Sequence, residues 1–330
     1  MSEIDVSIII VTYNTQEITY ECVKSIYESN TKLNYEVLLV DNNSTDNTVE
    51  TLKERFPQLK IISNSENLGF SKANNIGINL SIGRYVFLLN SDTVLFKDSL
   101  ENLVDTAILK RYQITGPILL NKDLTIQRSW LNFPSKFKIF LRLTDFHHIF
   151  YQFSDSFFFK IFYRKKIPAF MLKSIDDDTV MDYLTFAAIL INRDVINSIG
   201  NLDENLFFYQ EDCEFGLRAK KYNINFVYNV SSRIIHLGGS SSTKFSALAF
   251  ENDILGLLYI YKKHYSKTQF YLTKIAIFFA LLIRIILYYF GFYREFKSSI
   301  LYDASIHKIN MNKKVLELYY KLLKMVMLYN

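Results

Sequence analysis

The chain has 330 residues, 49% of them apolar, which suffices for one catalytic domain with an appendage, and its two cysteines, Cys22 and Cys213, form no Cys-x-x-Cys pair. This cysteine usage argues against a disulfide framework and a thiolate zinc site, and it fits a reducing compartment. Residues 271–330 carry nine Lys and Arg against three Asp and Glu, whereas the first 270 carry 29 against 30. A basic excess at an apolar end favours an anionic membrane surface over nucleic acid, for which no module signature is present.

The N-terminal segment predicts a strand rather than a secretion signal, because its apolar run covers only residues 6–11 and follows Glu3 and Asp5 instead of basic residues. From there, short runs rich in β-branched residues precede clusters of Asp, Asn and Ser, and helix-like stretches follow each cluster. This alternation predicts an α/β layered fold with parallel strands. The expected strands are residues 6–11, 35–40, 60–63 and 85–89, and the expected helices are residues 17–29, 46–56 and 71–81.

Three of the expected strands end in polar motifs, residues 12–14 (TYN), 41–44 (DNNS) and 90–92 (NSD). In a parallel sheet the ligand crevice lies outside the carboxyl ends of the strands, so we expect these motifs to line it. Asp41 can accept hydrogen bonds from a nucleobase or ribose, and Asp92 can bind a divalent cation that also holds a diphosphate. Each carboxylate taken alone is also compatible with an ordinary turn or helix cap.

Residues 67–75 (NLGFSKANN) open a helix directly after a glycine. The backbone N–H groups at such a helix start favour phosphate, and Lys72 can face the same crevice. A glycine turn followed by an exposed lysine explains the motif about as well. Neither GxxxxGK[ST] nor G-x-G-x-x-G occurs, so the phosphate loops of NTPases and dinucleotide enzymes are absent from the sequence.

Residues 207–218 (FFYQEDCEFGLR) place three acids at a helix start behind a run of aromatics. Mutual proximity and an apolar wall can raise the pKa of a carboxyl such as Asp212, which suits a general base. The alternative is that the acids complement the helix dipole, with Arg218 paired further along. His236 leaves an apolar strand into a glycine loop and can ligate the same metal, or it is a buried, hydrogen-bonded histidine.

Two segments outside this pattern suggest a membrane. Residues 133–170 interleave aromatic rings with Lys and Arg, which suits the bilayer interface or a helical pair packed on the domain. Residues 272–292 form the longest apolar stretch, interrupted by Lys274 and Arg284, and we expect it to lie in the interface, to span once or to be a core helix. In the last helix one face carries Val315, Leu318, Leu322, Met325 and Tyr329, and another carries Lys314, Glu317, Lys321 and Lys324.

Taken together and in order, these motifs resemble family 2 of inverting glycosyltransferases with the GT-A fold, and within it the rhamnosyltransferase-like members of bacterial surface-polysaccharide pathways. The match covers about residues 5–245. It rests on residues 6–14 (VSIIIVTYN), 41–46 (DNNSTD), 67–70 (NLGF), 90–92 (NSD), 200–204 (GNLDE) with 211–212 (ED), and His236 with residues 238–240 (GGS).

The resemblance implies an α/β fold of the GT-A type, a Rossmann-like mixed sheet flanked by helices, over residues 1–245, with an aromatic and basic insertion at about 131–172 and a membrane-associating helical region at 246–330. It implies that Asp212 is the general base beside Glu211. It also implies a Mn²⁺ or Mg²⁺ ion at Asp92, with His236 and Asn90. The implied nucleotide- and substrate-binding residues are Thr12, Tyr13, Asn14, Asp41, Asn43, Asn67, Gly69, Lys72, Asn74 and Ser91.

Two positions depart from the family pattern. Asn90 stands where the family has a first aspartate, and because it removes one negative charge from the metal site it predicts weaker ion binding. Residues 186–188 (FAA) stand where many relatives have a Gly-Ala pair, which predicts a reshaped acceptor pocket.

The implied activity is inverting transfer of a sugar from a nucleotide sugar, dTDP-rhamnose first and a UDP-hexose next, to a lipid-linked or cell-surface glycan. The expected location is the cytoplasmic side of the membrane, peripheral or with a single span, and no nucleic-acid partner is expected. A processive synthase would carry several spans. The alternative from another class is a catalytically inactive, nucleotide-sugar-binding or scaffolding subunit of a surface-polysaccharide complex, which the retained acids and His236 disfavour.

Overall fold

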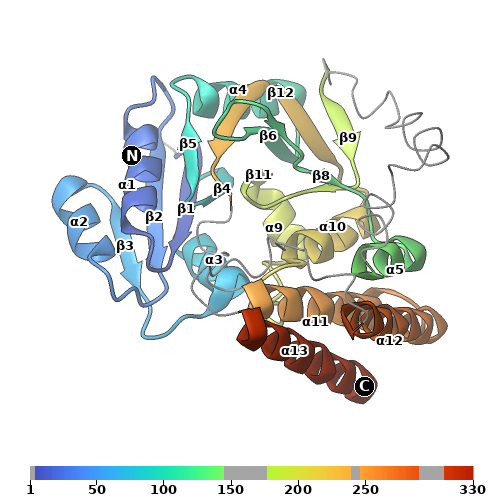
Figure 1. Cartoon of the computed structure of the whole chain (residues 1–330). Coiled ribbons are helices and arrows are strands. Elements are labelled where there is room, and N and C mark those ends of the chain that lie inside the picture. The colour runs from blue at the N-terminus through green and yellow to red at the C-terminus, as the bar shows by residue number, and fades with distance from the viewer. Residues whose placement is uncertain (1–3, 145–176, 239–245, 290–307, 330) are drawn as a thin grey trace, which may run out of the picture. The chain divides into compact units, whose positions relative to one another are not determined.

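The computed structural model describes residues 4–144, 177–238, 246–289 and 308–329 (Figure 1). The chain divides into two compact units, each built from two separate stretches. Residues 1–133 and 176–242 form the sheet unit, and residues 134–175 and 243–330 form the helical unit. The predicted insertion contributes helix α5 (Lys136–Thr144) to the helical unit, and its residues 145–172 lie outside the described part of the chain.

A mixed sheet forms the centre of the sheet unit, with its principal strands in the order β3-β2-β1-β4-β11-β6-β12-β5. β1 to β4 pair in parallel, β11 is antiparallel to both neighbours, β12 is parallel to β6, and β5 is antiparallel to β12. β7 pairs with β6, β9 pairs with β12, and β8 and β10 form a separate ribbon. The strands are β1 (Val6–Thr12), β2 (Tyr35–Asp41), β3 (Lys60–Ser63), β4 (Tyr85–Asn90), β5 (Thr93–Leu95), β6 (Ile114–Leu120), β7 (Ile126–Gln127), β8 (Trp130–Leu131), β9 (Thr179–Met181), β10 (Tyr183–Leu184), β11 (Ala188–Asn192) and β12 (Phe226–His236).

The predicted α/β fold is confirmed: the four expected strands are β1 to β4, each within one residue of its observed bounds, and the three expected helices differ from theirs by at most two residues. Helix α2 begins two residues later than expected because the Asp46 carboxylate accepts the Thr48 N–H at 3.1 Å and holds a turn ahead of the helix. The helices of the sheet unit are α1 (Gln16–Tyr27), α2 (Thr48–Arg55), α3 (Gly69–Leu80), α4 (Ser99–Lys110), α9 (Arg193–Ile199) and α10 (Glu211–Lys221).

The central strands read as continuous apolar runs because helices cover both faces of the sheet. Ile8 and Ile10 of β1 belong to one buried cluster with Cys22 of α1. On the opposite face Ile9 meets α3, where a Cβ on Gly77 would lie 2.5 Å from the Ile9 side chain. Both faces being occupied, the only polar atoms β1 offers to a ligand are at its carboxyl end.

The helical unit packs α5, α11 (Ser246–His264), α12 (Lys267–Tyr289) and α13 (Lys308–Leu328) around a core of its own (Figure 1). Residues 267–287 of α12, with mean hydropathy 2.2, are long and apolar enough to cross a bilayer, the one such stretch in the part of the chain that the structure describes. The buried core side chains include Ile254, Leu257, Leu258, Ile277, Leu281, Leu322 and Val326.

Arg284, the charge that interrupts this apolar helix, points into the helical unit and is 7% exposed. Its guanidinium donates to the Leu143 carbonyl oxygen and to the Tyr319 hydroxyl at 3.2 Å, and it lies 5.2 Å from the centre of the Phe250 ring. The charge is therefore satisfied by neighbouring helices rather than by solvent.

The apolar face of α13 is wider than the predicted stripe, of which Leu318, Leu322 and Tyr329 lie in or against the core of the helical unit. Leu322 is buried as expected, but its buried neighbours are Leu323 and Val326, whereas the expected Met325 is half-buried. The predicted spacing followed one row of the helix, while the observed contact covers the adjoining row as well. Val315 lies outside the residues whose side chains are described.

Candidate active site

Four parallel strands bring their polar ends to one edge of the sheet. The register sets Thr12 opposite Asp41, Asp41 opposite Ser63, and Val11 opposite Asn90. Neighbouring strands lie about 4.8 Å apart, so the ends of β1, β2 and β4 form one continuous row. The structure thus brings together the three strand-end motifs that the sequence singled out.

The loops after β1 and β2 are tied to each other. Asp41, 2% exposed, accepts the Ser44 N–H at 3.1 Å, and the Ser44 hydroxyl accepts the Asn14 N–H at 2.9 Å. Asn14 Oδ1 in turn accepts the Thr45 N–H at 2.7 Å. Asn14 and Asn43 both adopt the left-handed backbone region, with φ of 52° and 64°, which Asn tolerates better than most residues. These bonds fix the loops as one frame.

Thr12 and Tyr13 differ in their surroundings. Thr12 is buried, and its hydroxyl bonds the hydroxyls of Thr15 and Thr19 at 3.0 and 2.9 Å, so it fixes the start of α1. Tyr13 is only half-buried. Of the two, Tyr13 has the surface that a ligand can reach.

Gly69 joins the second strand end to the loop that precedes α10. Its carbonyl oxygen accepts from Asn42 Nδ2 at 3.0 Å, and its N–H donates to Asn67 Oδ1 at 2.9 Å. Gly69 has φ of 76°, and a Cβ there would lie 2.4 Å from the Phe207 carbonyl oxygen, which accepts the Phe70 N–H at 2.7 Å. Only glycine fits this approach.

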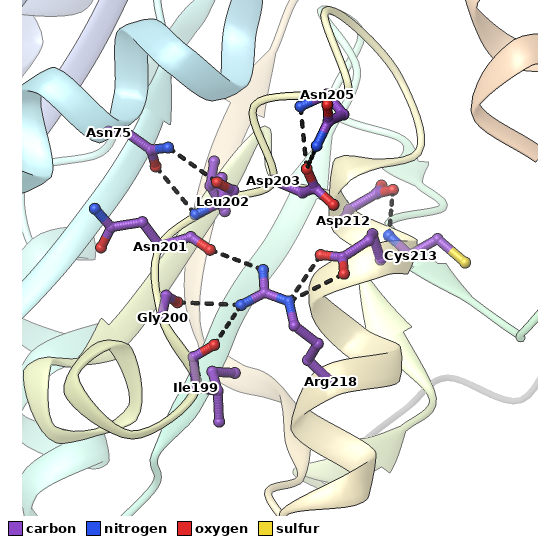
Figure 2. A network of polar contacts seen from close by, with 11 residues as sticks. Asn75, Ile199, Gly200, Asn201, Leu202, Asp203, Asn205, Asp212, Cys213 and Arg218 are labelled. Atoms are coloured by element: carbon purple, nitrogen blue, oxygen red, sulfur yellow. Dashed lines mark hydrogen bonds and ion pairs between the residues drawn. The ribbon is translucent and has the colours of Figure 1, made fainter. Parts of the chain in front are cut away.

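The rest of the α3 motif has mixed roles. Asn74 is buried and donates to the Phe70 carbonyl oxygen at 2.9 Å, which makes it a structural residue of the helix. Asn75 reaches further: it donates to the Leu202 carbonyl oxygen and accepts the Leu202 N–H, at 2.9 and 3.0 Å (Figure 2). Lys72 is exposed on the first turn.

Asp92 and His236, the predicted metal pair, lie together. His236 Nε2 is 3.3 Å from Asp92 Oδ1, and the two side chains are 17% and 11% exposed. The Leu237 N–H donates to the Asp92 carbonyl oxygen at 2.8 Å and holds the end of β12 beside the turn between β4 and β5. Asn90 ends β4 two residues earlier, and half-buried Ser91 stands between.

Gln127 on β7 orients the histidine ring. Its Nε2 donates to Asn121 Oδ1 at 3.0 Å and to the His236 carbonyl oxygen at 3.3 Å, so its Oε1 is the acceptor that lies 2.6 Å from His236 Nδ1. His236 Nδ1 therefore donates to Gln127, and this bond directs Nε2 at the Asp92 carboxylate. Sequence reasoning missed Gln127, because no local pattern marks a glutamine whose partner is 109 residues away.

A divalent cation fits this pair. A carboxylate oxygen and an imidazole lone pair that face each other at 3.3 Å repel unless a proton or a cation lies between them. Both groups are ligands suited to Mn²⁺. No group of three or more His, Cys, Asp and Glu gathers among the described residues, so the remaining positions around an ion would go to ligand oxygens and water.

Helix α10 begins with the acids that the sequence predicted to act together. Glu211 is 8% exposed, and its Oε2 has no hydrogen-bond partner. Burial, with a smaller effect of the nearby Asp212 charge, raises the pKa of Glu211 to about 8. Asp212 is half-buried, and its Oδ1 accepts the Cys213 N–H at 2.7 Å (Figure 2). At neutral pH Glu211 is thus protonated beside a more accessible carboxylate.

Arg218 ties α10 to the end of α9, as Figure 2 shows. Its Nε lies 2.8 Å from Glu214 Oε2, which confirms the predicted pairing within the helix. Its terminal nitrogens donate to the carbonyl oxygens of Ile199 and Asn201 at 2.6 and 2.8 Å. The sequence did not indicate these carbonyl contacts, which fix the loop leading towards Asp212.

Hydrogen bonds and close contacts link the site residues to different degrees. Asn42, the residue after Asp41, donates a hydrogen bond to the Gly69 carbonyl oxygen. Gly69 in turn lies against the loop that precedes α10. Asp92 reaches the same edge through Asn90 and β4. Asp212 and Asp92 make no direct bond with each other among these contacts. A cavity of about 510 Å³ between α1 and α2, lined by Gln16, Glu17, Tyr20, Glu21, Thr51 and Arg55, includes none of the predicted site residues.

The arrangement of the sheet unit is that of the GT-A fold. A solved mannosyltransferase from Pyrobaculum calidifontis, in complex with GDP-Man and Mn²⁺, superposes with a TM-score of 0.55 at 12% identity, covering 99% of this chain and 85% of that one. The structure of GalNAc-T7 with UDP, GalNAc and Mn²⁺ gives 0.53 at 15% identity, covering 82% of this chain and 56% of that one. These two superpositions confirm the predicted GT-A fold.

The sequence comparisons agree on the family. Residues 7–167 match the model of Glycosyl transferase family 2. The chain is 25% identical over 283 residues to a low-salt glycan biosynthesis hexosyltransferase of Haloferax volcanii, covering 83% of this chain and 82% of that protein. It is 25% identical to the N-acetylglucosaminyl-diphospho-decaprenol L-rhamnosyltransferase of Mycobacterium tuberculosis, covering 61% and 66%. The matched segment is just under half of the chain, and together these likenesses identify a glycosyltransferase, similar to family 2, that takes its sugar from a nucleotide donor.

Proposed function

We propose that this enzyme transfers a sugar with inversion of configuration to a hydroxyl group of a lipid-linked or cell-surface glycan. The observation that carries the proposal is the α10 start, where Asp212 stands half-buried beside the buried Glu211 and is joined by the Phe207 contact to the Gly69 helix start. One edge of the sheet then carries the base Asp212, the α3 start that would bind phosphate, and the β2 end that would bind the nucleoside.

The proposed reaction is a single displacement. Asp212 takes the proton from the acceptor hydroxyl, whose oxygen attacks the anomeric carbon from the face opposite the leaving group. The bond from that carbon to the diphosphate oxygen breaks, and its electron pair leaves with the nucleoside diphosphate. Protonated Glu211 adds no second negative charge at the helix start, so Asp212 stays the accessible proton acceptor.

The other residues hold the donor in this proposal. Asp41 and Tyr13 bind the nucleoside, and the α3 start with Lys72 faces the diphosphate. Asp92 and His236, with Asn90 beside them, hold a divalent cation, which supplies Lewis-acid stabilisation of the leaving diphosphate when bound. Gln127 keeps the His236 lone pair directed at that position.

The finer identity of the substrates is also proposed. The donor is dTDP-rhamnose, with a UDP-hexose next, a choice supported by the resemblance to rhamnosyltransferases and by the name of the Mycobacterium tuberculosis relative. The acceptor is a glycan on a lipid carrier, and the helical unit holds the enzyme at the cytoplasmic face of the membrane. The polyprenyl-linked substrate in that relative's name supports this acceptor class.

Transfer assays with and without EDTA test the function. We expect label from the donor to reach a lipid-linked acceptor only when Mn²⁺ or Mg²⁺ is present. Donor binding without transfer or hydrolysis under any of these conditions would instead favour the inactive, scaffolding role. Transfer that EDTA leaves unchanged would remove the cation from the proposal while keeping Asp212 in it.

A further inference from the structure

The two units carry opposite charge. The helical unit has 21 Lys and Arg against 7 Asp and Glu, a net formal charge of +14, whereas the sheet unit has 17 against 26, a net −9. Division along the sequence hides this asymmetry, because the helical unit combines residues 134–175 with residues 243–330. A surface of this sign attracts anionic lipid at about 1 kcal/mol per basic residue near the headgroups.

The same unit exposes an apolar stripe on α12. Leu272, Ile275, Phe279 and Ile286 are 46%, 51%, 51% and 45% exposed, and Leu282 between them is half-buried. The spacing of three, four, three and four residues puts all five on one side of the helix. Such a continuous apolar face is unusual on a soluble surface and marks an interaction site.

The opposite side of α12 is committed to protein. Thr273, Ile277, Ala280 and Leu281 are fully buried, and Arg284 is bonded to Leu143 and Tyr319 as described above. This side packs on α5, α11 and α13 (Figure 1). If α12 crossed the bilayer in this packing, those three helices would have to enter the hydrocarbon with it.

The neighbouring helices cannot do so cheaply. α11 carries Glu251 and Asp253, which pair with Lys321 of α13 and Arg142 of α5 at 2.6 and 2.9 Å on exposed surface. Charges at the centre of a bilayer are expensive, so these ion pairs oppose the entry of α5, α11 and α13 into the hydrocarbon. The packing therefore favours a helix that lies in the membrane plane.

We propose that the outer face of α12, from Leu272 to Ile286, lies flat in the headgroup region of an anionic membrane while its inner face stays packed in the helical unit. This rests on the membrane location proposed above and specifies the face and the orientation. Phe137 and Leu141 on α5, which packs on α12, are further exposed apolar side chains of the helical unit. Lys138 and Lys267, both exposed, meet the lipid phosphates.

Sedimentation of the full chain with vesicles tests the face. We expect binding to phosphatidylglycerol-containing vesicles to exceed binding to pure phosphatidylcholine, and expect the Ile275→Asp, Phe279→Asp double variant to weaken it at least tenfold. Leu109→Asp on α4, whose leucine is 81% exposed in the sheet unit, is the matched control and should leave binding unchanged. Circular dichroism confirms folding of each variant. Unchanged vesicle binding of the double variant would overturn the assigned face, whether or not the protein proves to be a transferase.

Depth measurements test the orientation. A nitroxide attached to a single cysteine at position 272, 275, 279 or 286 reports that site alone, since Cys22 and Cys213 are fully buried. A helix lying flat puts all four labels at one shallow depth, about 5–10 Å below the surface. Labels that are deepest in the middle of the series and shallow at its ends would show a spanning helix and overturn the proposal.

Discussion

The two units of the chain use their polar residues in opposite ways. In the sheet unit, buried and half-buried Asn, Asp, Gln and Arg side chains bond loops to one another, as Asn42, Asn75 and Arg218 do, and leave a few carboxylates at the strand ends. Among the described residues of the helical unit, Arg284 is the one charged side chain that is buried. Under the proposed function, this difference makes chemistry and location separable properties that different parts of the chain supply.

The largest expected effect is a loss of turnover, and it tests whether a change in the sheet unit leaves the helical unit unaffected. Asp212→Asn should lower kcat by roughly 10²–10⁴, because it removes the general base, while donor affinity and vesicle binding stay as in the wild type. Transfer kinetics, donor titration and sedimentation measure the three quantities. A variant with unchanged turnover would remove Asp212 from the role, and one that also loses vesicle binding would show that the units are coupled.

A glycine pair sharpens the account of the sheet unit. Gly69 and Gly200 both have positive φ, but a Cβ at 69 would meet the Phe207 backbone at 2.4 Å, whereas at 200 its nearest neighbour is the Arg218 side chain at 3.8 Å. Gly200→Ala should cost about 1–2 kcal/mol of unfolding free energy from backbone strain, and Gly69→Ala clearly more. Equal losses of unfolding free energy in the two variants, measured by denaturant unfolding, would show that the Phe207 backbone can move aside at little cost.

Two substitutions of Gln127, which contacts His236 of the proposed metal pair, should differ in their effect on Mn²⁺ affinity. Gln127→Glu keeps an acceptor for the His236 Nδ1 proton, whereas Gln127→Met keeps the size and removes the acceptor. Mn²⁺ affinity, measured by calorimetry, should fall about 10–100-fold in the Met variant and much less in the Glu variant. Equal affinities in all three proteins would show that Gln127 does not orient the ligand.

The last expected effect concerns the dependence of stability on pH. Because the pKa of Glu211 is raised to about 8 in the folded protein, the native state holds a proton that the unfolded chain has released above about pH 4.5. Unfolding free energy should therefore fall as pH rises from about 4.5 and level off above about 8. Glu211→Gln should flatten this part of the profile; a slope as steep as in the wild type would mean that another group causes it.

Local pattern allowed much of the fold to be predicted. The runs at 6–11 and 85–89 are apolar apart from Ser7 and end in polar residues, so the strands, their parallel pairing and the shared edge followed from sequence. What could not be predicted depends on contacts distant in sequence. The Gln127 contact with His236, the reach of Asn75 to Leu202 and the pairing of α5 with α12 leave no local signature.

The same limit explains the helical unit. Residues 272–292 could be read as interfacial, spanning or core, because hydropathy does not show which side of a helix is covered. The buried Arg284 and the exposed Phe279 separate the two sides only once α5, α11 and α13 are in place. Likewise the charge of +14 appears only when two distant stretches are counted as one unit.

The most direct measurement of the central claim is the melting temperature with a panel of nucleotide sugars, with and without Mn²⁺, for the wild type and for Asp92→Asn. A ligand that binds only the folded form raises the melting point. We predict that one nucleotide sugar stabilises the wild type when Mn²⁺ is present, and stabilises Asp92→Asn little or not at all. The same Mn²⁺-dependent rise in both proteins, or no rise with any member of the panel, would contradict a donor site built on Asp92.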